Sequence, residues 1–223
     1  MLDEAVIQRT LGAALRTGGE WAEIFVEDKR SSSAVLDDGK VEELTSGRDR
    51  GAGIRVVVGE STGFAHTADL TDEGLRTAAE AAAAAARGGT GGTTVVDLTR
   101  QTSPRPNEVA VAPEDVAKAT KVELLTRADR VAREQGSAIT QVMARYGDSR
   151  RKILIANSDG LLTGDDQVKT LFSVSCVAFG DTGMQTGRES IGHTIGFELF
   201  DEYDVEDLAR RAAERALTKL NAK

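Results

Sequence analysis

Residues 51–68 read GAGIRVVVGESTGFAHTA, and this stretch decides the fold class. The β-branched run from Ile54 to Val58 is typical of a strand. The turn residues 59–63 follow it, and residues 64–68 predict a second strand. Thr71 then predicts a helix N-cap, with Asp72 and Glu73 in the first turn of a helix that runs to about Arg87. The stretch therefore predicts a strand hairpin followed by a helix.

Apolar alternation and turn residues predict further elements on both sides of this stretch. The expected strands are Trp21–Glu27, Ser33–Leu36, Val41–Thr45, Ala138–Tyr146, Arg151–Ala156 and Val168–Phe179. The expected helices are Leu2–Arg16, Pro113–Gln135 and Asp204–Leu220. On the first strand, Ala22, Ile24 and Val26 are expected to face the core, because side chains alternate between the two faces of a sheet.

Residues 88–113 differ in composition from the rest and predict a connector. They include two Gly-Gly pairs and all three prolines, and residues 94–98 could form one short strand. The connector separates residues 1–87 from residues 114–223, and both parts run helix, antiparallel strands, helix. We therefore predict an α+β fold of two similar helix–antiparallel sheet–helix units, which suggests a duplication.

Charge and composition limit the class of protein. The net charge is -8, and the basic residues are interspersed with acidic ones, a pattern that does not favour direct nucleic-acid binding. No apolar run approaches the roughly 20 residues that span a bilayer, and the start of the chain lacks the features of a secretory signal. Cys176 is the only cysteine, so no intrachain disulfide can form. We expect a cytoplasmic protein without membrane partners.

The residues that could carry chemistry form no known catalytic pattern. His66 and His193 do not belong to a metal-binding motif, and Cys176 alternates inward on its strand, as a buried structural thiol would. Gly51 and Gly53 precede a strand rather than a helix, so backbone geometry explains them better than phosphate binding. The chain alone therefore predicts no catalytic, cofactor-binding or metal-binding residue.

Residues 187–196, GRESIGHTIG, form the least regular segment. Its glycines predict a flexible hairpin loop. The polar side chains of this segment could instead contact a substrate or a partner. The candidate contact residues are Arg188, Glu189, Ser190 and His193.

Several blocks of the chain resemble the N-terminal region of the TldD/PmbA family, also called modulators of DNA gyrase. The blocks are residues 51–59 with 61–65 and 67–70, residues 155–160, and residues 188–192 leading to 196–198. The resemblance covers essentially the whole chain and is closer to the metal-bearing TldD type. The last helix ends where family members continue into a second half.

The resemblance implies a metallopeptidase that degrades or processes unfolded peptides. Family members of the TldD type hold zinc with a His-Glu-x-x-x-His helix and a cysteine in their C-terminal half, and this sequence contains no such motif. We therefore expect a C-terminal metal-binding domain outside this chain, and no activity of this segment alone. The implied partners are the protein's own C-terminal half, a second TldD/PmbA-type subunit in a homo- or heterodimer, and a peptide substrate.

The role left for this region is assembly and substrate handling. A sheet edge can accept an extended peptide through main-chain hydrogen bonds, and Val41–Thr45 and Gly187–Gly196 are the segments expected at such an edge. The alternatives are a non-catalytic dimerisation or interaction module, and a modulator of DNA gyrase that acts through protein contacts.

Overall fold

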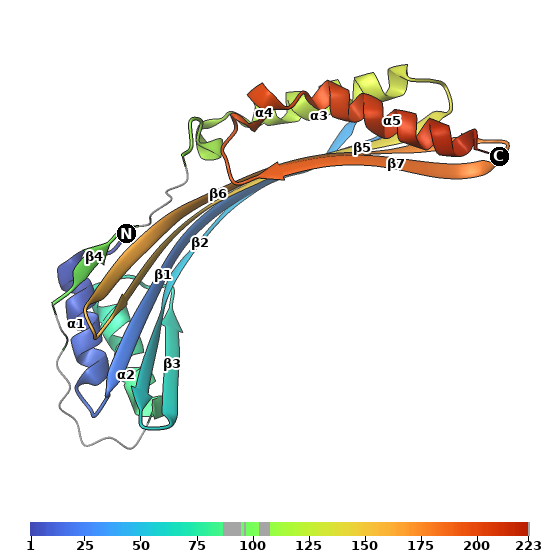
Figure 1. The fold of residues 1–223 in the computed structure, drawn as a ribbon. Helices are drawn as coiled ribbons and strands as arrows, with labels where there is room; N and C mark the ends of the chain where they lie inside the picture. Colours follow the sequence, from blue (N-terminus) through green and yellow to red (C-terminus); the bar gives the residue numbers. More distant parts are fainter. Residues whose placement is uncertain (87–94, 96, 103–107, 223) are drawn as a thin grey trace. The chain divides into compact units, whose positions relative to one another are not determined.

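The computed structural model describes the chain except residues 87–94, 96, 103–107 and 223. Its residues group into two compact units, each built from three segments of the chain (Figure 1). Unit 1 comprises residues 1–29, 48–106 and 151–166, and unit 2 comprises residues 30–47, 107–150 and 167–223. The units do not follow chain order because four long strands each contribute one end to each unit. The domain boundaries expected at residues 87 and 114 remain a prediction.

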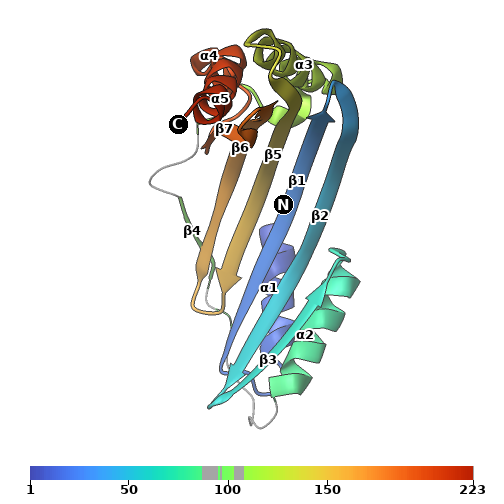
Figure 2. The ribbon, with the colours of Figure 1, turned by 90° about the vertical axis from the view of Figure 1, so that its right-hand side faces the viewer.

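The long strands are β1 (Trp21–Asp37), β2 (Lys40–Val58), β5 (Ile139–Asn157) and β6 (Leu161–Gly180). Unit 1 adds β3 (Ser61–Thr67) and β4 (Thr99–Gln101), and its strand order is β3-β2-β1-β5-β6-β4. Helices α1 (Glu4–Leu15) and α2 (Asp72–Ala86) pack against each other and cover one face of these strands (Figure 2). Ala22, Ile24 and Val26 are buried in this core, as the alternation predicts.

The hairpin of residues 51–68 forms as expected. Strands β2 and β3 pair antiparallel from Val58 opposite Ser61 to Ala52 opposite Thr67. The hydroxyl of Thr71 then accepts a 3.2 Å hydrogen bond from the amide of Gly74, which caps α2.

Unit 2 places β7 (Gly183–His193) beside β6, so that its strand order is β2-β1-β5-β6-β7. The short helix η1 (Pro113–Asp115) precedes α3 (Lys118–Glu134), and α4 (Leu199–Glu202) precedes α5 (Val205–Leu220). Helices α3 and α5 pack together, and α5 lies along β7. Their apolar faces and the inward residues of β1, β5 and β6 form the core of unit 2. The α+β prediction is confirmed.

Both units dock a helix directly on a glycine of an edge strand. A Cβ atom at Gly63 of β3 would lie 1.9 Å from the carbonyl oxygen of Ala82 in α2. A Cβ atom at Gly187 of β7 would lie 2.0 Å from the carbonyl oxygen of Ala212 in α5. The last helix of each unit therefore sits on its strand through backbone contact, which only glycine permits.

Some predicted elements were wrong in extent. The expected pairs of short strands within 21–36, 41–58 and 138–156 are the single strands β1, β2 and β5. Polar residues suggested breaks there, but ladder hydrogen bonds join backbone groups and do not require apolar side chains. The strand expected at 94–98 falls partly outside the described residues, and the observed strand β4 begins at Thr99. The loop expected at 187–196 is strand β7 as far as His193.

We predict that Gly63→Ala and Gly187→Ala each lower the free energy of unfolding by about 1–3 kcal/mol, because the added methyl group must push the helix away. Gly12→Ala is the matched control. Nothing lies within 4 Å of a Cβ atom at this position in α1, so alanine should raise stability by about 0.5–1 kcal/mol. Urea denaturation measures all three, and equal effects of G12A and G63A would contradict the docking argument.

Candidate peptide-binding edge

The end of β2 that belongs to unit 2 is an exposed strand edge. Every residue from Lys40 to Gly47 is exposed, and β3 pairs with β2 only from Ala52 onward. Among the described residues, no other strand pairs with Lys40–Gly47 on the side away from β1. Two apolar side chains of this segment are exposed, Val41 at 46% and Leu44 at 41%. We call residues 40–47 the β2 edge.

A two-residue turn, Asp38 and Gly39, precedes this edge. Asp38 and Gly39 both have positive φ angles, 50° and 78°, and they connect β1 to β2. This turn matches the twist of the paired strands and fixes their register. On the β2 edge, Thr45 and Glu43 hydrogen-bond to Ser33 of β1, at 2.7 Å each, which ties the edge to its neighbour.

The second edge of unit 2 is β7, and α5 partly protects it. Lys219 Nζ donates a 2.8 Å hydrogen bond to the carbonyl oxygen of Thr186. A lysine over a strand edge is a common way to block further strand pairing. The β2 edge is therefore the more accessible of the two.

The four candidate residues predicted on 187–196 do not gather in one place. Arg215 Nη2 of α5 lies 2.6 Å from Glu189 Oε1, and Gly187 touches the same helix. Arg188 and Ser190 are exposed and alternate along the strand with Gly187 and Glu189. Arg188 and Ser190 therefore lie on the opposite face of β7. His193 stacks on Tyr203, with ring centroids 5.1 Å apart. A contact role for these residues stays a prediction.

Sequence reasoning missed a buried polar cluster in unit 2. Lys121 of α3 and Asp148 of β5 form a 2.7 Å ion pair, with side chains only 5% and 7% exposed. Ser32 of β1 accepts a 2.8 Å hydrogen bond from Lys121 and donates one to Asp148. Tyr146 packs its ring 5.2 Å from the ammonium group, and burial, followed by the charge of Asp148, raises the pKa of its phenol. The spacing of Lys121 from Leu124, Leu125 and Ala128 could have placed it on the buried helix face.

A second missed residue, Glu198, fastens the segment that follows β7. Its carboxylate accepts hydrogen bonds from the amides of Val111 and Gly196, at 2.9 Å each, and of Ala110 at 3.2 Å. Burial alone would raise the pKa of Glu198, but these backbone amides hold it below its usual value. Residues 196–198 belong to a block that resembles the family, but no sequence pattern predicts these hydrogen bonds of Glu198.

Cys176 and His66, the other residues considered for chemistry, occupy structural positions. Cys176 is fully buried, and burial raises the pKa of its thiol to about 11, so it lacks the setting of a nucleophile. His66 stacks on Phe64 on β3. Within the part of the chain that the structure describes, no three His, Cys, Asp or Glu side chains come together as a metal site would need. None of the described helices is long and apolar enough to cross a membrane.

Two family descriptions match the chain. Residues 22–86 match "PmbA/TldA metallopeptidase domain 1", and residues 112–220 match "PmbA/TldA metallopeptidase central domain". This chain belongs to the TldD/PmbA metallopeptidase family. The matched regions are the N-terminal ones of the family, as the resemblance of the sequence blocks predicted.

The relatives of this family member agree with that assignment. It is 35% identical to a metalloprotease of Methanothermobacter thermautotrophicus and 29% identical to the metalloprotease TldD homolog of Haemophilus influenzae, over 91% of the chain in each case. The chain spans 44% and 43% of the length of these relatives. In fold it is similar to a Thermotoga maritima protein described as a modulator of DNA gyrase, with a TM-score of 0.81 at 18% identity over 99% of this chain and 49% of that one.

We predict that Lys121→Met lowers the free energy of unfolding by about 3–5 kcal/mol, because it leaves the Asp148 charge buried without a partner. Arg76→Met is the control, since the Arg76–Glu80 pair is exposed and contributes about 0.3–0.5 kcal/mol. Urea unfolding compares the two, and a loss for K121M no larger than for R76M would contradict the burial argument.

We predict a pH-dependent stabilisation by Glu198. Its folded pKa lies below the usual 4.5, so its contribution is present above pH 4.5 and disappears as the pH falls through the folded value. Unfolding free energies of wild type and Glu198→Gln should therefore differ most at pH 7, and the difference should shrink as the pH falls below 4.5. A difference that is constant with pH would show that the charge of Glu198 does not matter.

Proposed function

We propose that this chain is the assembly and substrate-handling part of a TldD/PmbA-type metallopeptidase. In this role the β2 edge accepts an unfolded peptide as an additional strand. Main-chain hydrogen bonds would hold the peptide with little dependence on its sequence. Exposed Val41 and Leu44 would add apolar contacts to some of its side chains.

The observation that supports this proposal is the free side of β2 beyond its pairing with β3. An exposed strand edge is a template for pairing with another chain unless it is blocked, and proteins usually block such edges. The β7 edge carries such a block in Lys219, whereas the described residues place no comparable contact on the backbone of the β2 edge.

The residues of this chain do not fit the zinc ion that the family implies. Zinc sites take three or four His, Cys, Asp or Glu ligands, and the described residues contain no such group. We therefore propose that the metal and the catalytic residues lie outside these 223 residues, and we assign no catalytic step to this chain.

The same edge could instead pair with a second TldD/PmbA-type subunit. That outcome would make the region an assembly module rather than a peptide-binding one. The two cases differ in their occupant, an unfolded peptide or another folded subunit, and a binding experiment separates them.

We predict that a proline in the β2 edge abolishes peptide binding. Adjacent amides of a strand point to opposite sides, so one of Leu44→Pro and Thr45→Pro removes an outward amide while the other removes an amide directed at β1. The variant that keeps its stability is the informative one, and the alanine substitution at the same position is its control. Anisotropy of fluorescein-labelled β-casein measures binding to the whole chain.

Wild type and the alanine control should bind β-casein, and the stable proline variant should lose binding at least about tenfold. Unchanged binding in that variant would overturn peptide capture at this edge. Sedimentation of the same samples tests the alternative. If the proline variant changes from dimer to monomer and wild type does not bind β-casein, the edge serves assembly.

A further inference from the structure

A pocket in unit 1 lies where β3 stops pairing with β2. The last pair of that ladder is Ala52 with Thr67, after which the chain leaves the sheet through residues 68–71 toward α2. Residues 48–50 of β2 therefore lose their neighbour, and a cavity of about 350 Å³ opens beside them. This volume is at the small end of the range for ligand pockets, about 300–1,000 Å³.

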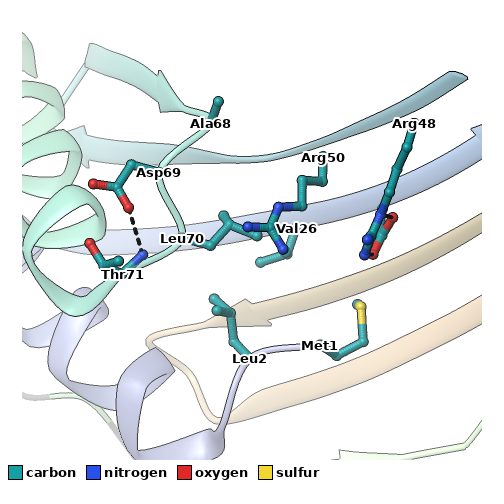
Figure 3. Close-up of a pocket in the computed structure, with 10 residues that line it drawn as sticks. Met1, Leu2, Val26, Arg48, Arg50, Ala68, Asp69, Leu70 and Thr71 are labelled. Carbon is teal, nitrogen blue, oxygen red and sulfur yellow. Dashed lines mark hydrogen bonds and ion pairs between the residues drawn. The ribbon is translucent and has the colours of Figure 1, made fainter.

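The pocket has an apolar wall and four charged side chains. Figure 3 shows its lining, which consists of Met1, Leu2, Val26, Asp28, Arg48, Arg50, Ala68, Asp69, Leu70 and Thr71. The first residues of the chain and residues 68–71 form its sides, and Val26 of β1 contributes an apolar side chain.

Three of the four charged side chains are engaged within the lining. Arg48 holds Asp28 through two parallel hydrogen bonds, of 2.8 Å from Nε and 2.5 Å from Nη2. Asp69 accepts a 3.0 Å hydrogen bond from the amide of Thr71, and that hydrogen bond holds the pKa of Asp69 below its usual value. Both carboxylates are thus hydrogen-bonded within the lining.

Arg50 differs from Arg48 in having no such partner. Within the described residues, its guanidinium makes no hydrogen bond and no ion pair. Figure 3 shows it pointing into the pocket toward Leu70. A guanidinium offers a planar fork of donors that matches a carboxylate, and the apolar wall beside it leaves those donors for a ligand.

We propose that this pocket binds the free carboxylate at the C-terminus of a peptide whose last residue is apolar. Arg50 pairs with the carboxylate, and the terminal side chain packs against Leu2, Val26 and Leu70. The volume accommodates one such residue. The proposal rests on the proposed function only in taking a peptide as the source of the carboxylate.

The test uses the whole ¹⁵N-labelled chain and small probes of matched shape. N-acetyl-leucine carries the carboxylate and the apolar side chain, N-acetyl-leucinamide lacks the charge, and inorganic phosphate lacks the apolar part. We expect saturable amide shifts at the pocket residues with N-acetyl-leucine, and binding of the other two at least about tenfold weaker. Equal binding of the acid and the amide, or of phosphate, would overturn the proposal.

Substitution of Arg50 connects the binding to this residue. Arg50→Gln should weaken N-acetyl-leucine binding at least about tenfold, the range expected for loss of a charge-assisted hydrogen bond, and Arg50→Lys should weaken it less. Arg55→Gln is the matched control on the same strand, because Arg55 pairs with Glu23 at 3.2 Å and stacks on Trp21, away from the pocket. Equal effects of R50Q and R55Q would overturn the assignment.

Two peptides identify the source of the carboxylate. One ends in leucine with a free carboxylate, and the other has an internal glutamate and an amidated end. Shifts in the pocket with only the first peptide support the proposal, and equal shifts with both overturn the choice of a peptide C-terminus. Proline in the β2 edge should leave these shifts unchanged, so the two proposals can fail separately.

Discussion

Direct contact between a helix and the backbone of an edge strand is the constraint on which both units depend. Ala82 and Ala86 of α2 lie over Gly63, and Ala212 and Ala216 of α5 lie over Gly187. Alanine and glycine leave so little bulk that helix and sheet approach more closely than larger side chains allow. The alanine-rich helices are therefore buried along one face despite their small side chains.

That packing also determines which backbone remains available. Strand β3 is short and ends at Thr67, so it pairs with β2 only from Ala52 to Val58. The remaining part of β2 provides the exposed edge in unit 2 and the wall of the Arg50 pocket in unit 1. Both proposed binding features thus follow from the length difference between two paired strands. Polar contacts such as Lys121–Asp148 and those of Glu198 fix the elements around them.

In the proposed function, the metal chemistry of the family lies outside this chain. The chain supplies sheet edges, helices and a pocket that contains Arg50, and it contains no cluster of metal ligands among its described residues. A proteolytic enzyme also has to hold an extended peptide in place, and main-chain pairing does so without selecting one sequence. Recognition of a terminal carboxylate would add a preference for peptide ends to that general mode.

The sequence by itself determined the fold class, the hairpin of residues 51–68, the inward face of Ala22, Ile24 and Val26, and the family. These are local or pattern properties, because β-branched runs, turn glycines and N-caps act over a few residues. Only the tertiary structure decided that short predicted strands merge into long ones and that residues 187–193 are a strand. It also decided that Arg48 pairs with Asp28, whereas Arg50 pairs with none of the described residues. In the sequence both arginines belong to one mixed charged run, and their difference depends on Asp28, twenty residues away, and on where β3 ends. Such pairings depend on which segments meet in space, and a periodic pattern within one segment carries no information about its neighbours.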